Sequence, residues 1–201
     1  MKGSLIIVVF FVAGLLLGYS GATPAFLENK DLSTYALYIL LFLVGISVGA
    51  DKSALNVIRN VKLELLVLPF FILIGTYVGV SVVSLFLSDI SIGDSLAVGS
   101  GMGYYSVSSI IINEVKGERL GALALLSNIM REIITLLFSP FLVILFGKLA
   151  PLASGGATSM DSTLSMTKQC SGKEYVVVAI FSGTVLTILV PFLVSFILEI
   201  F

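Results

Sequence analysis

The sequence predicts an all-α membrane protein in which about seven helices cross the bilayer. Of its 201 residues, 58% are hydrophobic and only 11% are charged. A soluble domain carries about 25% charged residues, so this chain lacks the charge to cover a water-facing surface. The mean hydropathy is +1.14, and long apolar runs alternate with short connections along the whole chain. A single membrane domain over residues 1–201 is therefore expected.

Seven apolar segments have roughly the length that a spanning helix requires. The fourth is rich in Gly and Ser, and the sixth is interrupted by Gly155, Gly156 and Asp161. In order, the segments are 4–22, 33–50, 61–87, 95–113, 120–146, 149–167 and 175–198.

The fourth and sixth segments resemble each other. Residues 98–109 and 153–163 are both stretches of small and hydroxyl-bearing residues between strongly apolar helices. Paired glycine-interrupted segments in corresponding places are the sequence signature of a binding site in an inverted-repeat transporter. We therefore expect two discontinuous helices and a transporter.

The distribution of basic residues predicts a cytoplasmic N-terminus and an external C-terminus, because cytoplasmic loops carry more Lys and Arg. If all seven segments cross, only Lys30 and Lys148 fall outside, and the acidic loop around Asp89 and Asp94 is external. The basic residues placed inside are Lys2, Lys52, Arg59, Lys62, Lys116, Arg119, Lys168 and Lys173.

Composition also excludes several classes of protein. The net charge of −1 gives no footprint for nucleic acid, and no histidine is available as a metal ligand or ordinary proton carrier. No phosphate-binding glycine loop is present, which argues against ATP-driven transport by this chain. We expect no cofactor and no metal.

Asp161 is the first candidate for a binding residue. It lies in the run GGATSMD at 155–161, at mid-membrane depth if that segment crosses. A charge there costs about 2.5–3.5 kcal/mol on insertion scales, so it needs a partner or a function. The functional interpretation is a carboxylate that binds a cation, a proton or an ammonium group. The alternative is a re-entrant loop with Asp161 near the surface, capping a helix.

A second candidate group lies in the fifth segment. Asn128 and Glu132 are four residues apart and share a helix face, with Arg131 beside it. A second carboxylate near Asp161 would suit a cationic substrate or proton exchange, since neighbouring carboxylates raise the pKa of one of them. The alternative for Arg131 is an internal ion pair that only fixes helix packing.

The two interrupted segments supply the remaining candidates. Their glycines allow unwound backbone or close helix packing, and their hydroxyls and tyrosines offer hydrogen bonds to a substrate. These candidates are Gly101, Tyr104, Tyr105, Ser106, Ser108, Gly155, Gly156, Thr158 and Ser159.

With these residues in view, the chain resembles the LysO family of bacterial lysine exporters. The matching stretches are GSGMGYYS at 99–106, SN-x-x-RE at 127–132, the run GGATSMDSTL at 155–164 and Val190-Pro191, with LVGI at 43–46. The resemblance implies export of L-lysine, and of analogues such as thialysine, across the inner membrane. It also implies that buried carboxylates at Glu132 and Asp161 carry the substrate or the coupling ion.

Two departures from the family accompany this resemblance. Family members often carry an acid at the position of Asn128. They also have an additional N-terminal segment, which predicts that a small membrane partner supplies those helices or that the chain works as a homodimer.

Three other functions stay open at this point. The same interrupted helices would suit a cation–proton antiporter or another carrier of small organic ions. An intramembrane aspartyl enzyme needs two deep aspartates, whereas Asp94 falls in an expected external loop. A passive channel subunit would show flux that does not saturate.

Overall fold

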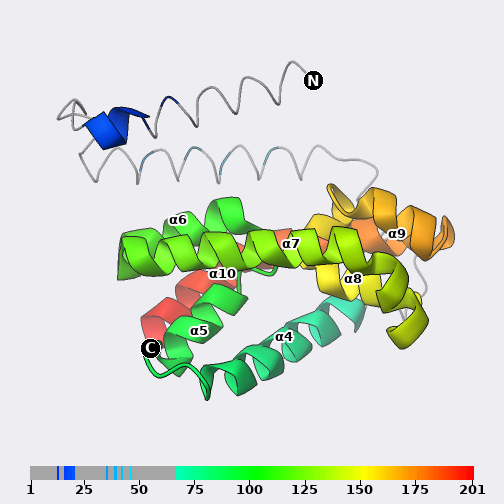
Figure 1. The fold of residues 1–201 in the computed structure, drawn as a ribbon, viewed down its shortest axis with the longest axis horizontal. Coiled ribbons are helices and arrows are strands. Elements are labelled where there is room, and N and C mark those ends of the chain that lie inside the picture. The colour runs from blue at the N-terminus through cyan, green and yellow to red at the C-terminus, as the bar shows by residue number, and fades with distance from the viewer. Residues whose placement is uncertain are drawn as a thin grey trace. The chain divides into compact units, whose positions relative to one another are not determined.

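The structure is a computed structural model that describes residues 67–201, together with positions 13, 16–20, 35, 39, 42 and 46. The chain divides into two compact units, residues 1–39 and 40–201. All helices with defined bounds belong to the second unit (Figure 1). The predicted spans 4–22 and 33–50, and the start of 61–87, lie outside the described residues apart from those few positions.

Residues 67–201 are helical throughout, with short connections and no strand. This confirms the predicted all-α class. The helices are α4 (Leu68–Ser84), α5 (Ile92–Gly99), α6 (Tyr105–Lys116), α7 (Glu118–Phe146), α8 (Ala150–Gly155), the 3₁₀ helix η2 (Gly156–Met160), α9 (Leu164–Cys170) and α10 (Glu174–Ile200).

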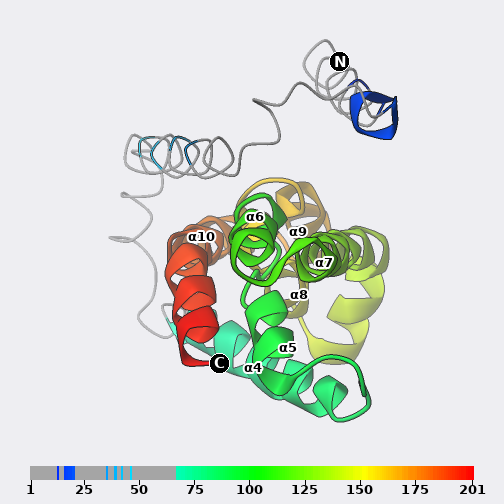
Figure 2. The same ribbon diagram turned by 90° about the vertical axis from the view of Figure 1, so that its left-hand side faces the viewer.

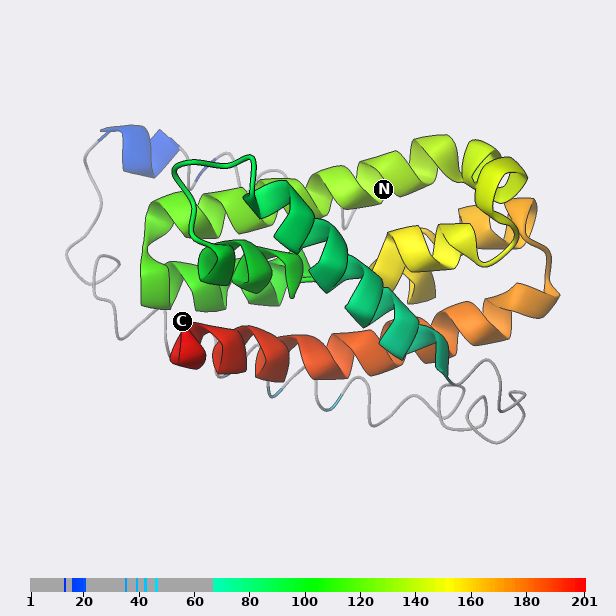
Figure 3. The same ribbon diagram turned by 90° about the horizontal axis from the view of Figure 1, so that it is seen from below.

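Two of the described helices are long and apolar enough to cross a membrane, namely α7 and α10. The 29 residues of α7 extend about 43 Å, which exceeds a hydrocarbon core of about 30 Å. The two helices run in opposite directions (Figure 3), and α5 and α6 each contact both of them. The apolar helix α4 is shorter, with 17 residues, and contacts α5 and α10.

The fourth predicted segment is a hairpin that returns to the side from which it entered. We call residues 92–116 hairpin A: α5 leads inward, the chain breaks at 100–104, and α6 leads back out. Lys116 Nζ lies 3.2 Å from Asp94 Oδ1, which joins the two outer ends. A continuous helix would separate these residues by about 33 Å.

The outer end of hairpin A is also stabilised by the N-cap of α5. The side chain of Ser91 accepts a hydrogen bond from the Asp94 N–H at the start of α5. Burial alone would raise the pKa of the Asp94 carboxyl, but hydrogen bonds with Ser91 and the charge of Lys116 lower it overall.

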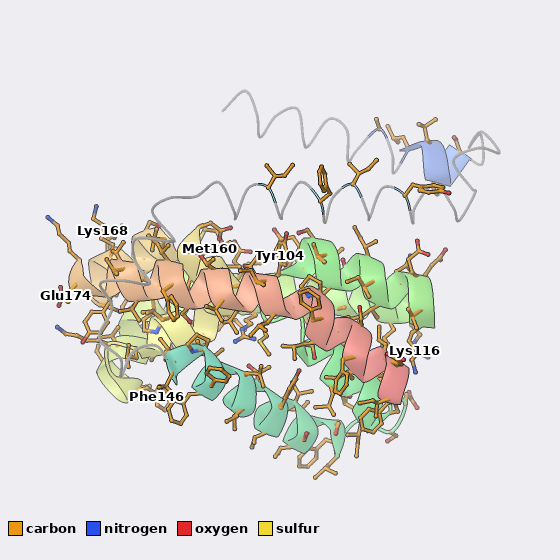
Figure 4. The ribbon with its side chains drawn as sticks, turned by 180° about the vertical axis from the view of Figure 1, so that it is seen from behind. Tyr104, Lys116, Phe146, Met160, Lys168 and Glu174 are labelled. Atoms are coloured by element: carbon orange, nitrogen blue, oxygen red, sulfur yellow. The ribbon has the colours of Figure 1, made fainter. Side chains whose placement is uncertain are left out.

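The sixth predicted segment is a second hairpin that enters from the opposite end of α7. We call residues 150–170 hairpin B, which consists of α8, η2 and α9. Lys148 Nζ lies 3.6 Å from Glu174 Oε1, so the residues flanking this hairpin also lie together. Figure 4 places Lys116 at one end of the unit and Lys168 and Glu174 at the other.

The expectation that both interrupted segments cross the membrane is therefore wrong for this structure. Each has enough apolar residues for a crossing, but its glycine break reverses the chain. As a consequence Lys116 and Arg119 lie at the same end as Asp94, not on the opposite side as the sequence predicted. The two reversals cancel, so the sides on which α4 begins and α10 ends are unchanged.

The tips of the two hairpins meet between α7 and α10. Figure 2 shows the unit from one end, with α10 and α7 on either side of the other helices. The Ala157 N–H donates a 2.8 Å hydrogen bond to the Met102 carbonyl. Gly103 and Gly156 have positive φ angles of 95° and 63°. A Cβ on Gly156 would lie 2.4 Å from the Met102 oxygen, and one on Gly103 would lie 2.8 Å from the Gly155 oxygen. Glycine is needed at both positions because backbone touches backbone there.

The helix α10 supports hairpin B from behind. A Cβ on Gly183 would lie 2.7 Å from the Met160 Cβ and 2.9 Å from the Ala157 oxygen, so η2 packs directly on the α10 backbone. The Ser159 hydroxyl donates to the Ala179 carbonyl at 3.1 Å. Hairpin B is therefore fixed against α10 on one side and faces α7 on the other.

Candidate functional site

A pocket of about 180 Å³ opens where the two hairpins meet α7. Hairpin A, α7, hairpin B and α10 each contribute to its wall. We call it the carboxylate pocket, and its lining residues are Gly103, Tyr104, Tyr105, Ser106, Glu132, Ala157, Thr158, Met160, Asp161, Ser162 and Thr187.

The two carboxylates of the pocket come from different elements. Glu132 lies fourteen residues from either end of α7, about 21 Å along the helix from each, and is half-buried. Asp161 ends the 3₁₀ helix η2 and is exposed, with Oδ1 accepting a hydrogen bond from the Ser162 N–H. The sequence predicted two carboxylates buried in the membrane, and in the structure both line the pocket.

Hairpin A brings its tyrosines to the same place. Tyr105 lies within electrostatic range of both Glu132 and Asp161, and Tyr104 lies within range of Asp161. Figure 4 shows Tyr104 and Met160 near each other in the middle of the unit. The phenol groups and the Ser106 hydroxyl are thus available as hydrogen-bonding groups in the pocket wall.

The charge of this pocket favours a cation. Glu132 and Asp161 line it, and no Lys or Arg is among its lining residues. Two carboxylates that line one pocket, without a basic partner in its wall, attract a positively charged group. The pocket can therefore hold a small molecule with an ammonium group, a metal cation or protons.

Five of the candidate residues from the sequence lie in the packed hairpins instead of the pocket wall. Ser108 and Ser159 are fully buried, and their hydroxyls donate to the Tyr104 and Gly156 carbonyls. The other three are Gly101, Gly155 and Gly156, all buried.

Asn128 and Arg131 line a different space, which we call the apolar chamber. It has a volume of about 290 Å³ and lies among α4, α5 and α7. The adjacent residues Arg131 and Glu132 therefore belong to two separate cavities, as expected for neighbours about 100° apart around a helix. The chamber is lined by Thr76, Val80, Val83, Leu87, Ile90, Ser95, Val98, Gly99, Leu123, Ser127, Asn128 and Arg131.

Sequence reasoning missed five lining residues. Gly103, Ala157, Met160 and Ser162 adjoin residues that were selected, so proximity in the sequence was a usable signal. Thr187 lies on α10, and its hydroxyl is 3.9 Å from the Met160 sulfur. No motif marks Thr187, because only the packing of η2 on α10 brings it to the pocket.

The chain is similar to known membrane exporters over nearly its whole length. Residues 8–198 match the family model described as "Lysine exporter LysO". A relative from Escherichia coli strain K12, named "Lysine exporter LysO", is 34% identical over 186 residues, which is 92% of this chain and 60% of the relative. The chain thus spans 60% of the length of that relative.

A second relative has nearly the same length as this chain. It comes from Haemophilus influenzae strain Rd, is named "Putative lysine exporter", and is 30% identical over 185 residues, which is 92% of this chain and 93% of the relative. The comparison with solved structures gave no match.

Proposed function

Since the chain belongs to the lysine exporter LysO family, we propose that it forms the substrate-binding part of a secondary transporter that exports L-lysine across the bacterial inner membrane. Analogues that keep both amino groups, such as thialysine, would use the same site. The family model and both relatives are described as exporters, which favours transport over the aspartyl-enzyme alternative.

The carboxylate pocket is the observation that supports this proposal. Lysine carries one more ammonium group than most amino acids at neutral pH, and the pocket offers Glu132 and Asp161 with no competing base in its wall. Tyr104, Tyr105 and Ser106 would add hydrogen bonds. A few well-placed polar groups in a small cavity are typical of a site for a small molecule.

The same carboxylates would serve for coupling. When lysine leaves, the two negative charges that line the pocket attract another cation in its place. We therefore propose exchange of lysine for an external cation, with the proton as the first candidate. A cation–proton antiporter would use the pocket in the same way, and a substrate panel separates the two functions.

The arrangement of the hairpins supports an inverted repeat. Hairpins A and B enter from opposite ends of α7, and each has a glycine break at its tip. We propose that the two form the paired discontinuous helices of an inverted-repeat transporter. The full chain would then cross the membrane with α4, α7, α10 and the two predicted N-terminal spans.

Charge also supports an orientation for this arrangement. The end of the unit that carries Lys148, Lys168 and Lys173 has a single described acid near it, Glu174. The end with Lys116 and Arg119 carries more acids than bases: Asp89, Asp94, Glu114, Glu118 and Glu199. We propose that the Lys148 end faces the cytoplasm, with the N-terminus inside and the C-terminus outside.

The direct test measures labelled L-lysine flux into proteoliposomes that contain the purified chain, with and without a pH gradient. Glu132→Gln and Asp161→Asn should each lower saturable flux about tenfold or more, since a hydrogen bond to a charged group contributes about 1.5–3 kcal/mol. Melting temperatures should stay near wild type, because neither side chain is buried.

Glu118→Gln is the matched control, since it removes a carboxylate from the end of the same helix, away from the pocket. Normal lysine flux in both pocket variants would show that the site is wrong. If wild type shows no flux, the predicted small membrane partner is tested next by supplying the N-terminal segment of the longer relative. Flux that appears only then supports a partner.

A further inference from the structure

We infer that Asn128 and Arg131 are positioning residues: each fixes one hairpin to α7, and neither contacts the substrate. The inference rests on the proposed transport function, but the contacts that support it are independent of the substrate. Both residues are polar, lie in the middle of an apolar helix, and face away from the carboxylate pocket.

Asn128 is bonded across the break of hairpin A. Its Oδ1 accepts a 2.8 Å hydrogen bond from the Gly103 N–H, and its Nδ2 donates to the Val98 carbonyl at 3.3 Å. The same Nδ2 donates to the Ala124 carbonyl within α7 at 2.8 Å. The side chain is only 4% exposed, so these partners use its donors and its acceptor. Asn128 therefore ties both ends of the unwound segment to α7.

Arg131 is bonded to the break of hairpin B. Its Nε donates to the Ser154 carbonyl at 2.7 Å, and its Nη2 donates to the Ala153 carbonyl at 3.0 Å. These carbonyls end α8 and have no partner within the helix. A guanidinium satisfies two of them together and opposes the partial negative charge at a helix C-terminus. Among the described residues, Arg131 pairs with no carboxylate, which argues against an internal salt bridge.

The two anchors lie within one turn of the pocket carboxylate on the same helix. Asn128, Arg131 and Glu132 fall within five consecutive positions of α7. Hairpin A carries Tyr104 and Ser106 into the pocket, and hairpin B carries Asp161. A shift of either hairpin on its anchor would therefore move one wall of the pocket relative to Glu132.

A substrate-binding role and a positioning role for Arg131 predict different effects of its loss. If Arg131 bound the substrate carboxylate, its loss would weaken lysine but spare cadaverine, which is lysine without that carboxylate. If Arg131 only positions hairpin B, its loss should weaken both molecules by the same factor, because the pocket wall moves for both.

The first experiment reads hairpin opening without any substrate. In a Cys170→Ser background, Ser108→Cys reports on hairpin A and Ser159→Cys on hairpin B, since both serines are fully buried. The rate of labelling by N-ethylmaleimide is measured by mass spectrometry. Arg131→Met should raise labelling at position 159 about tenfold or more, and at 108 by less than about twofold.

Asn128→Ala should give the reverse pattern, so that the labelling rate rises over wild type more at position 108 than at position 159. Ser127→Ala is the matched control, because its hydroxyl donates to Ala124 within α7, and it should change neither rate. Equal acceleration at both positions, or at neither, would overturn the assignment of one anchor to each hairpin. Arg131→Lys keeps the charge but can satisfy fewer carbonyls, so it should fall between wild type and Arg131→Met.

The second experiment measures the concentrations of unlabelled L-lysine and cadaverine that halve labelled lysine flux. In Arg131→Lys, both concentrations should rise by the same factor. A rise for lysine alone would overturn the inference and make Arg131 a carboxylate ligand. If wild type transports no lysine even when the N-terminal segment of the longer relative is supplied, the proposed function fails, while the labelling experiment still decides whether Asn128 and Arg131 anchor the hairpins.

Discussion

Replacement of Gly156 by alanine tests the contact between the hairpin tips most directly. Gly156 has a φ of 63°, and its Cβ would lie 2.4 Å from the Met102 oxygen. That oxygen accepts the hydrogen bond from the Ala157 N–H that joins the two hairpins. A methyl group at this position must therefore push the carbonyl away and break the bond.

The expected loss of stability has two contributions. A left-handed conformation costs a residue with a Cβ about 1–2 kcal/mol. A buried hydrogen-bonding group that loses its partner costs about 1–3 kcal/mol more. Together they should lower the free energy of unfolding by about 2–5 kcal/mol. At about 2–4 °C per kcal/mol for a chain of this size, the melting temperature should fall by roughly 4–20 °C.

The assay is thermal unfolding of the purified protein in mild detergent, followed by circular dichroism. Gly147→Ala is the matched control, because its φ is 85° but no atom lies within 4 Å of the added Cβ. It should show the conformational cost alone. Gly79→Ala lies inside α4 with open space around its Cβ, and should stabilise by up to about 1 kcal/mol. If Gly156→Ala melts within about 2 °C of Gly147→Ala, the tips do not meet as described.

Two further predictions concern hairpin A and the ends of the unit. In a cysteine-free background, Asp89→Cys and Arg119→Cys should be labelled by an impermeant maleimide from one side of the membrane, and Lys173→Cys from the other; labelling of the first two from opposite sides would refute the hairpin. The lowered pKa of Asp94 means that its stabilisation is present at neutral pH and lost as the pH falls through that pKa. Asp94→Asn should therefore melt below wild type at neutral pH, by an amount that shrinks once the pH falls below about 4. Lys116→Met should behave alike, and a deficit that does not change with pH would contradict the ion pair.

Part of the fold could be predicted from the sequence because composition and breaks are local properties. Low charge and long apolar runs predict helices, and the glycine clusters around Gly101 and Gly156 coincide with the two observed breaks. The direction of the chain after a break is not local. The apolar run 95–113 has the length of a crossing helix, so hydropathy cannot distinguish a crossing from a hairpin. That information lies in the contact of Asp94 with Lys116.

The carboxylate pocket, like the fold, could be predicted from the sequence only in part. Glu132 and Asp161 were selected because ionisable residues are costly in apolar segments, and the structure brings both to one pocket. The same cost argument selected Asn128 and Arg131, which the structure directs to backbone groups and the apolar chamber. The cost of a buried polar group predicts that it has a partner, but backbone carbonyls satisfy that requirement as well as a substrate does.

The contacts of Asn128 also account for the asparagine at a position where family members often carry an acid. An acid at this position would add negative charge, so the asparagine implied one negative charge fewer and a difference in selectivity. In the structure Asn128 does not line the carboxylate pocket, and its amide donates to the Val98 and Ala124 carbonyls. An ionised carboxylate has no donor for either carbonyl and would repel both. The asparagine therefore takes no ligand from the pocket, and its amide suits the contacts that hold hairpin A on α7.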